Sequence, residues 1–260
     1  MVNIPKVNVQ VDVDGNEIFD KVLDPIVSPT SQTLGLIPRA IHAAFIPLEK
    51  WVLNKEYNLA ETQALLEQKL RNVAPEKIVP PEPYVAVPAM QALSYSVNNA
   101  DLCDMYASLL AKAMHDQTKE KVHPSFVESI KQMSPIDAQL FKEIGKFSVL
   151  PLVQLHEKLS DGYNLLETNI SGFDIADHDV LSASIDNLAR LKLIEIPWDE
   201  HFVNDATYDT VLNSTEYQTL YNKHRATKFD KLEPNKKLMR VTSLGRLFYQ
   251  VCIGSSFNLR

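Results

Sequence analysis

Glycine and cysteine are scarce in this sequence, and their scarcity argues against two classes of protein. Only 7 of the 260 residues are glycine and they are widely scattered, so the chain has no glycine-rich loop of the kind that cradles phosphates. The two cysteines are too few for the disulfide scaffold of a small secreted protein. Cys103 and Cys252 each lie in an apolar, helix-like run, and we expect both to be buried, reduced thiols.

Long apolar runs are also missing. No stretch of about 18 uncharged apolar residues occurs, so we expect no membrane-spanning helix. Residues 1–24 do not resemble a signal peptide. The net charge of −7 argues against a protein that coats nucleic acid along its whole surface. These features together predict a cytoplasmic protein.

The motifs of common active sites are absent. The sequence has no His-Glu-Xaa-Xaa-His, Gly-Xaa-Ser-Xaa-Gly or Cys-Xaa-Xaa-Cys, and no two histidines are three or four residues apart. The best catalytic candidate is His115-Asp116 with His123, which would place a base beside a carboxylate. His123 precedes Pro124, however, and is explained more simply as a helix-start residue whose ring bonds to the neighbouring backbone.

A second polar group lies in a loop that contains Asp174, Asp177, His178 and Asp179. Such a loop could catch a cation, but it is typical of a solvated segment that caps the helix predicted to begin at Val180. We therefore predict no catalytic residue, no metal site and no cofactor. The protein is not expected to be an enzyme.

The fold class predicted from hydrophobic periodicity is mainly α. Apolar residues recur at helical spacing in several segments. These segments are residues 59–73, 87–97, 101–115, 124–133, 136–147 and 180–191. Near the start, Val7–Val13 alternates strictly between valine and polar residues. This pattern predicts a short strand or hairpin, or an extended arm that pairs with the sheet edge of another chain.

Residues 31–53 are the most apolar part of the chain, and Pro38 and Pro47 interrupt them. One interpretation is a buried pair of helices. The alternative is an amphipathic segment at a membrane surface or a partner, with Phe45 and Trp51 making the contact. Peripheral membrane contact is thus a secondary hypothesis.

The last third of the chain has the order of elements of a winged helix. The helix at 180–191 runs into a short β-branched segment that Pro197 ends, and residues 237–242 are a candidate partner strand before a terminal helix. We therefore expect an N-terminal arm at 1–30, a helical domain at 31–133 and a winged-helix-like α+β domain at 134–260.

The predicted winged helix raises the question of nucleic-acid binding. Residues 223–246 contain eight basic and two acidic residues, which suits contacts to phosphates. The candidate nucleic-acid-binding residues lie on the predicted recognition helix and on the strand that follows. They are Asn187, Arg190, Lys236, Lys237 and Arg240. Winged helices also dock proteins, so a protein-binding module is the other interpretation.

Three phrases in the centre of the chain resemble a known family. They are the proline-framed Val79–Tyr95, the helix Met105–Met114, and Val122–Pro135 with its His-Pro pair, and weaker similarity continues through Thr242–Ile253. In this order and spacing they resemble the Abi-alpha (abortive infection alpha) family. The resemblance implies a bacterial or prophage-encoded protein that limits phage spread by harming the infected cell. It brings no catalytic residue, and the same phrases are also explained by helix packing.

The function we expect is accordingly a non-enzymatic sensor or effector of phage defence. It would act through protein contacts, with self-association or a phage component as its partner. The alternative is a regulator that binds nucleic acid through residues 181–246.

Overall fold

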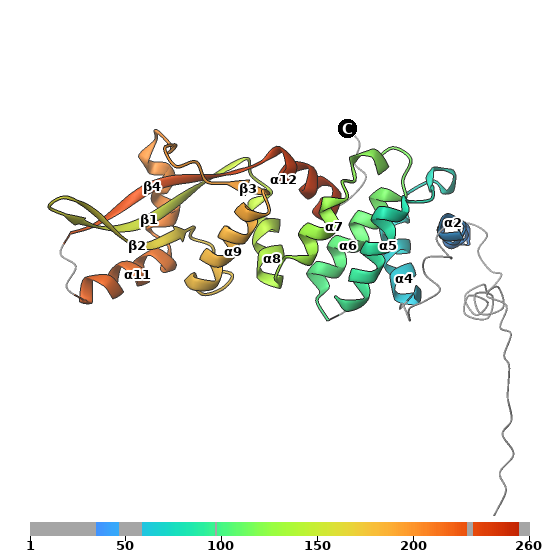
Figure 1. Cartoon of the computed structure of the whole chain (residues 1–260), viewed down its shortest axis with the longest axis horizontal. Coiled ribbons are helices and arrows are strands. Elements are labelled where there is room, and N and C mark those ends of the chain that lie inside the picture. Colours follow the sequence, from blue (N-terminus) through green and yellow to red (C-terminus); the bar gives the residue numbers. More distant parts are fainter. Residues whose placement is uncertain (1–34, 47–58, 97, 228–230, 255–260) are drawn as a thin grey trace, which may run out of the picture.

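The computed structural model describes residues 35–46, 59–96, 98–227 and 231–254. In this part of the chain the molecule is elongated, with a helical end, a sheet end, and α8, α9 and α12 between them (Figure 1). The elements of the helical end are α2 (Leu36–Phe45), α4 (Leu59–Leu70), η3 (Pro75–Lys77), α5 (Pro83–Tyr95), α6 (Ala100–Ala113), η4 (Lys119–Lys121) and α7 (Ser125–Lys131). The elements that follow are α8 (Pro135–Ile144), β1 (Val149–Leu159), β2 (Gly162–Ile170), α9 (His178–Arg190), β3 (Ile194–Glu195), η5 (Asp205–Tyr208), α10 (Asp209–Leu212), α11 (Thr215–Ala226), β4 (Leu232–Val241), α12 (Ser243–Phe248) and the π-helical η6 (Tyr249–Ile253).

Helix α6 is the centre of the helical end. Nine of its 14 residues are buried, and it contacts α4, α5, α7, α8 and η6. Asn99 caps its N-terminus by accepting a hydrogen bond from the backbone N–H of Leu102 at 2.9 Å. The family-like phrase Met105–Met114 is therefore the most enclosed segment of the helical end, which gives it a packing role.

The predicted helices are confirmed, with shifted ends. Ser134 and Asp137 explain why α8 begins where it does, because they form a capping box: Ser134 Oγ accepts from the Asp137 N–H at 3.1 Å, and Asp137 Oδ2 accepts from the Ser134 N–H at 2.7 Å. Pro135 occupies the first helical turn, where its missing N–H costs nothing.

The sheet has four antiparallel strands in the order β2-β1-β4-β3. Strands β1, β2 and β4 have 11, 9 and 10 residues, whereas β3 has only 2. In the β1–β2 hairpin Leu159 pairs with Gly162, so only Ser160 and Asp161 form the turn. Gly162 has a φ of 125°, a conformation that glycine adopts without strain.

The prediction of a mainly α chain with a winged-helix-like C-terminal module was wrong. The four-stranded antiparallel sheet makes the fold α+β, and the long β1–β2 hairpin inserted between α8 and α9 is not part of the predicted layout. The hairpin escaped prediction because residues 162–168 of β2 carry no buried side chain, so the strand has little apolar alternation. In β1, Pro151 and Lys158 interrupt the alternation of apolar residues that would predict a strand.

Two hydrophobic cores hold the described residues together. The larger one runs through the helical end and continues beneath the base of the sheet, where Leu152 and Met239 contribute. The second lies on the other face of the sheet, where Val153 and Leu155 of β1 pack against η5, α10 and α11. Adjacent residues of β1 therefore point into different cores, as the pleat of a strand requires.

The cysteines behave as expected. Cys103 and Cys252 are both buried and neither forms a disulfide. The Sγ of Cys103 donates to the carbonyl oxygen of Ser96 at 2.9 Å, and burial raises the pKa of the Cys252 thiol. Among the described helices, none is long and apolar enough to cross a bilayer. The predicted strand Val7–Val13 lies outside the described residues.

Candidate functional site

A group of ionisable side chains connects β2, α9 and α11. We call Glu167, His178, Glu216 and His224 the ion cluster. His178 Nδ1 lies 2.8 Å from Glu216 Oε1, and its Nε2 lies 3.5 Å from Glu167 Oε2. His224 Nε2 lies 2.6 Å from Glu167 Oε1. The exposed fractions of these four side chains are between 8% and 15%, so the contacts are largely shielded from water.

The backbone helps to position the cluster. Glu216 lies in the first turn of α11, which Ser214 caps, and its Oε2 accepts the N–H groups of Ser171 and Gly172 at 3.1 and 2.7 Å. Gly172 has a φ of 77°, so the chain turns directly after β2 at a residue that tolerates this conformation. His178 is the first residue of α9.

The electrostatics of the cluster favour its charged form. Burial acts to lower the pKa of His178, but the hydrogen bond and charge of Glu216, with the charge of Glu167, outweigh it and raise that pKa. Burial likewise acts to raise the pKa of Glu167, but the hydrogen bond from His224 and the charge of Lys223 lower it. An imidazolium between two carboxylates is a poor general base, so the cluster fastens α11 to β2 and α9.

Sequence reasoning missed three of the four members. His178 was noted as part of an acidic loop, but Glu167, Glu216 and His224 had no sequence signal, because Glu216 is 38 residues from His178 and His224 is 57 residues from Glu167. Across the residues that the structure describes, the ion cluster included, no three or more histidine, cysteine, aspartate or glutamate side chains are grouped to hold a metal ion.

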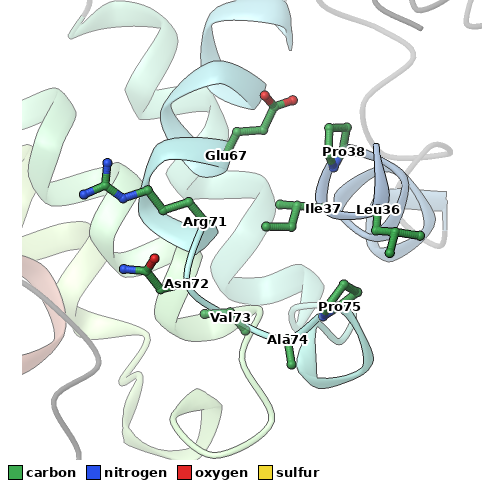
Figure 2. Close-up of a pocket in the computed structure, with 9 residues that line it drawn as sticks. All are labelled: Leu36, Ile37, Pro38, Glu67, Arg71, Asn72, Val73, Ala74 and Pro75. Carbon is green, nitrogen blue, oxygen red and sulfur yellow. The ribbon is translucent and has the colours of Figure 1, made fainter. Parts of the chain in front are cut away.

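A cleft of about 540 Å³ opens at the far end of the molecule, between α2, the C-terminal end of α4 and η3. Figure 2 shows Ile37 pointing from α2 toward α4, which carries Glu67, whereas the Arg71 side chain extends away from Ile37. The lining is mostly apolar. It consists of Leu36, Ile37, Pro38, Glu67, Arg71, Asn72, Val73, Ala74 and Pro75. This size and lining suit apolar side chains from a partner, with the Glu67 carboxylate to orient them.

The structure places the predicted nucleic-acid-binding residues of α9 in a contact with the α7–α8 connection. Asn187 Nδ2 donates to the carbonyl oxygen of Gln132 at 2.9 Å and to Asp137 Oδ2 at 2.8 Å. Arg190 Nη1 donates to Gln132 Oε1 at 2.8 Å, and its Nε donates to Asn187 Oδ1 at 3.0 Å. These two side chains therefore have partners within the chain.

The predicted residues of β4 also have intrachain partners. Lys236 forms an ion pair with Asp205 at 2.7 Å. Lys237 donates to the carbonyl oxygen of Trp198. Arg240 pairs with Glu195 at 3.4 Å and with Glu200. Two of the eight basic residues at 223–246, Lys236 and Arg240, are thus paired with acidic residues from 195–205, and nucleic-acid binding stays a prediction.

The structure describes one of the two residues of the predicted membrane or partner segment. Phe45 is half-buried and packs against the larger core. Trp51 lies outside the described residues. The half-burial of Phe45 fits the buried-helix interpretation of residues 36–45, and α2 contacts α4 and η3.

The histidines considered for catalysis have local hydrogen bonds. His115 is buried, its Nδ1 accepts from the Gln117 N–H at 3.1 Å and lies 3.4 Å from Asp116 Oδ1, and burial lowers its pKa. His123 Nδ1 accepts from the Ser125 N–H at 3.1 Å, which confirms its interpretation as a helix-start residue.

Comparison with known proteins supplies the family. The model of the family described as abortive infection alpha matches residues 54–252, which is more than half of the chain. The chain therefore belongs to the abortive infection alpha family, as the resemblance in its central phrases predicted.

Individual proteins add little to the family match. No curated protein matches the chain. Among solved structures, the chain is similar to an uncharacterized protein from the hydrocarbon-degrading marine bacterium Alcanivorax borkumensis SK2. The sequence identity is 15%, the match covers 52% of this chain and 94% of that one, and the TM-score is 0.32.

Proposed function

We propose that this protein serves in bacterial defence against phage, as a sensor or effector that acts through contacts with other proteins. The observation that carries the proposal is the match of the abortive infection alpha family across residues 54–252. The family description names a response in which the infected cell is harmed and phage spread is limited. A phage component or a second copy of the chain would be the partner.

The surface of the described residues offers a place for such a contact. The cleft between α2 and α4 has a mostly apolar lining, and Leu36 at its border is 45% exposed. Apolar side chains that line a concave surface favour protein docking, because a partner removes them from water. A partner segment with apolar side chains would bury this lining, and Glu67 would fix its direction.

The experiment that tests the role compares bacteria that express the protein with bacteria that carry an empty vector. At low phage multiplicity we expect the expressing culture to survive, and at high multiplicity we expect it to collapse. Absence of protection across a broad phage panel would overturn the proposed role. Survival of individual cells at high multiplicity would contradict the harm to the infected cell.

A pair of substitutions in α2 tests the contact surface. Leu36→Asp places a charge at the border of the cleft, whereas Ile46→Asp places the same charge beside the other end of α2, away from the cleft lining. The two side chains are similarly exposed, at 45% and 51%. We expect Leu36→Asp to abolish protection while Ile46→Asp retains it, with equal protein levels. Equal protection by both variants would exclude the cleft as the contact surface.

A further inference from the structure

Strand β2 is an open edge of the sheet. The order β2-β1-β4-β3 leaves β2 with one neighbour, and in the described residues its backbone forms no ladder beyond β1. Residues 162–165 are exposed, and the exposed fractions of Tyr163 and Leu165 are 58% and 49%. At the other side of the sheet, β3 and an ion pair from Asp205 to Lys236 cover parts of β4. The outer edge of β2 is therefore available for a further strand at residues 162–165, whereas Thr168 and Asn169 near its base contact Ser182 of α9.

This edge lacks the protective residues that are common in edge strands, although two register shifts interrupt it near the base of the sheet. Edge strands are usually protected by lysine, proline or inward-pointing charges. The sequence Gly-Tyr-Asn-Leu-Leu-Glu-Thr-Asn-Ile of β2 has no lysine and no proline, and its one charged residue, Glu167, is engaged in the ion cluster. By contrast β4, which is paired along its length with β1, contains Pro234, Lys236, Lys237 and Arg240. These residues are thus on β4, whose outer edge pairs with β3 only at Arg240 and Val241, and lysine and proline are absent from β2.

The edge of β2 is regular in the half next to the hairpin turn. We call this half, residues 162–165, the distal half. Register shifts in the β1–β2 ladder lie between Val153 and Leu155 and between Leu155 and His156, and β-bulges of this kind disturb further pairing near the base. Beyond them the ladder from His156–Leu165 to Leu159–Gly162 is continuous. Tyr163 and Leu165 share one face, where the ring of His156 lies 5.8 Å from that of Tyr163. A partner strand would meet the segment around Asn164.

The side chains of β2 suit a second copy of this chain as the partner, because Tyr163 and Leu165 lie on either side of Asn164 on one face, and the local charges permit it. Two copies with a net charge of −7 each repel one another unless they meet at locally neutral surfaces. Residues 162–166 of β2 carry no charge, and Glu167 is compensated by His224 and Lys223. Lys158 is paired with Glu233 at 3.3 Å, and the exposed Asp161 lies in the adjoining turn. Two identical neutral strands approach without like-charge repulsion.

We infer that two copies of the chain associate through the outer edges of β2, antiparallel about a two-fold axis, to form a continuous eight-stranded sheet. The register that covers the exposed apolar side chains places Tyr163 opposite the partner's Leu165 and Asn164 opposite the partner's Asn164. Each half of the contact then gains an aromatic–aliphatic cross-strand pair in addition to the main-chain hydrogen bonds. The interface is isologous, as in most dimers.

This inference deepens the proposed function and rests on it, since it names self-association as one of the protein contacts. The assays below use purified full-length protein and need no phage. A monomeric protein that still protects bacteria would contradict the dimer and leave the phage-defence role intact. A dimer that gives no protection would contradict the phage-defence role and leave the dimer intact.

The first experiment measures molar mass by light scattering or sedimentation velocity across the micromolar range. Leu165→Lys adds a charge to the open edge, and Leu159→Lys is its matched control, because both leucines are 49% exposed but Leu159 is on β1. We expect a concentration-dependent dimer for the wild type and Leu159→Lys, and a dissociation constant raised about tenfold or more for Leu165→Lys. A wild type that stays monomeric, or equal effects of both substitutions, would overturn the inference.

The second experiment tests the register and the identity of the strand. Asn164→Cys should form an intermolecular disulfide under mild oxidation, whereas Ser160→Cys in the turn should not, and the buried Cys103 and Cys252 do not interfere. Crosslinking at 160 without crosslinking at 164 would contradict the register.

The last variant, Val9→Lys with Val11→Lys in the full chain, tests whether the N-terminal arm pairs with the edge instead. Loss of the dimer in this variant would mean that the arm, and not β2, pairs with the edge.

Discussion

His178 Nδ1 lies 2.8 Å from Glu216 Oε1, and this contact joins the first turns of two helices that begin 37 residues apart. Glu216 also accepts two backbone N–H groups from the chain directly after β2. One carboxylate thus binds three polar groups from two neighbouring segments, and α11 owes much of its position to it. The second hydrophobic core lies beside this contact, so the same carboxylate keeps α11 over that core.

Replacing Glu216 with alanine should destabilise the protein strongly. The substitution leaves His178 and two backbone N–H groups without their acceptor in a site where the Glu216 side chain is only 8% exposed. We expect a loss of about 3 kcal/mol in the free energy of unfolding, measured by urea denaturation. Glu128→Ala removes an exposed pair with Lys131 and should cost less than about 0.5 kcal/mol. Similar losses for the two variants would show that the cluster does not fasten α11.

The ion cluster should also give the stability a defined pH dependence. The pKa of His178 is raised above its ordinary 6.5, so its contribution is fully present below pH 6.5 and is lost as the pH rises through the raised value. The pKa of Glu167 is lowered below its ordinary 4.5, so its contribution is present above pH 4.5 and is lost as the pH falls through the lowered value. The cluster therefore stabilises the fold most between pH 4.5 and 6.5.

A His178→Gln variant tests this dependence. We expect it to lose part of the decline in unfolding free energy that the wild type shows on the alkaline side, because no imidazolium remains to be deprotonated. His156→Gln is the control: burial lowers the pKa of His156, so its contribution is lost as the pH falls and its removal leaves the alkaline decline in place. An unchanged alkaline decline in His178→Gln would exclude His178 as its origin.

How far the sequence could predict this protein depends on the range of the interactions. The segment that became α6 has an apolar face at helical spacing, and Ser134-Pro135 begins α8 with a cap formed by neighbouring residues, so local patterns sufficed. The exposed half of β2 has no such pattern, and only its pairing with β1 makes it a strand. The ion cluster forms only where β2, α9 and α11 come together. The spacing of residues along the chain does not predict that Glu167 and Glu216 contact the same histidine.

Gly245 should tolerate no side chain. A Cβ at this position of α12 would overlap the backbone carbonyl of Leu193, which also accepts a hydrogen bond from the Thr242 N–H at 3.1 Å and cannot move freely. We expect Gly245→Ala to lower the free energy of unfolding by about 3 kcal/mol. Gly35→Ala, where no atom lies within 4 Å of the added Cβ, should be nearly neutral. Equal thermal stability of the two variants would contradict the close approach of α12 to the β3 segment.

The intrachain partners of Lys236, Lys237 and Arg240 lead to a prediction about nucleic acid. A phosphate would have to displace Asp205 from Lys236, or Glu195 and Glu200 from Arg240, which removes much of the electrostatic gain of binding. Lys237 would lose its hydrogen bond to the Trp198 carbonyl oxygen. We therefore expect neutralising the three to glutamine to change the affinity for a labelled duplex no more than neutralising the exposed Lys119, Lys121 and Lys131 does.

Fluorescence anisotropy between about 50 and 200 mM salt measures this difference, because each phosphate contact steepens the salt dependence of the affinity. The two triple variants have the same net charge, so a general electrostatic effect is equal in both. A steep salt dependence in the wild type that is lost only when Lys236, Lys237 and Arg240 are neutralised would show that these side chains exchange their carboxylate partners for phosphates. Nucleic acid would then be a ligand of β4, and the acidic segment 195–205 would act as its competitor.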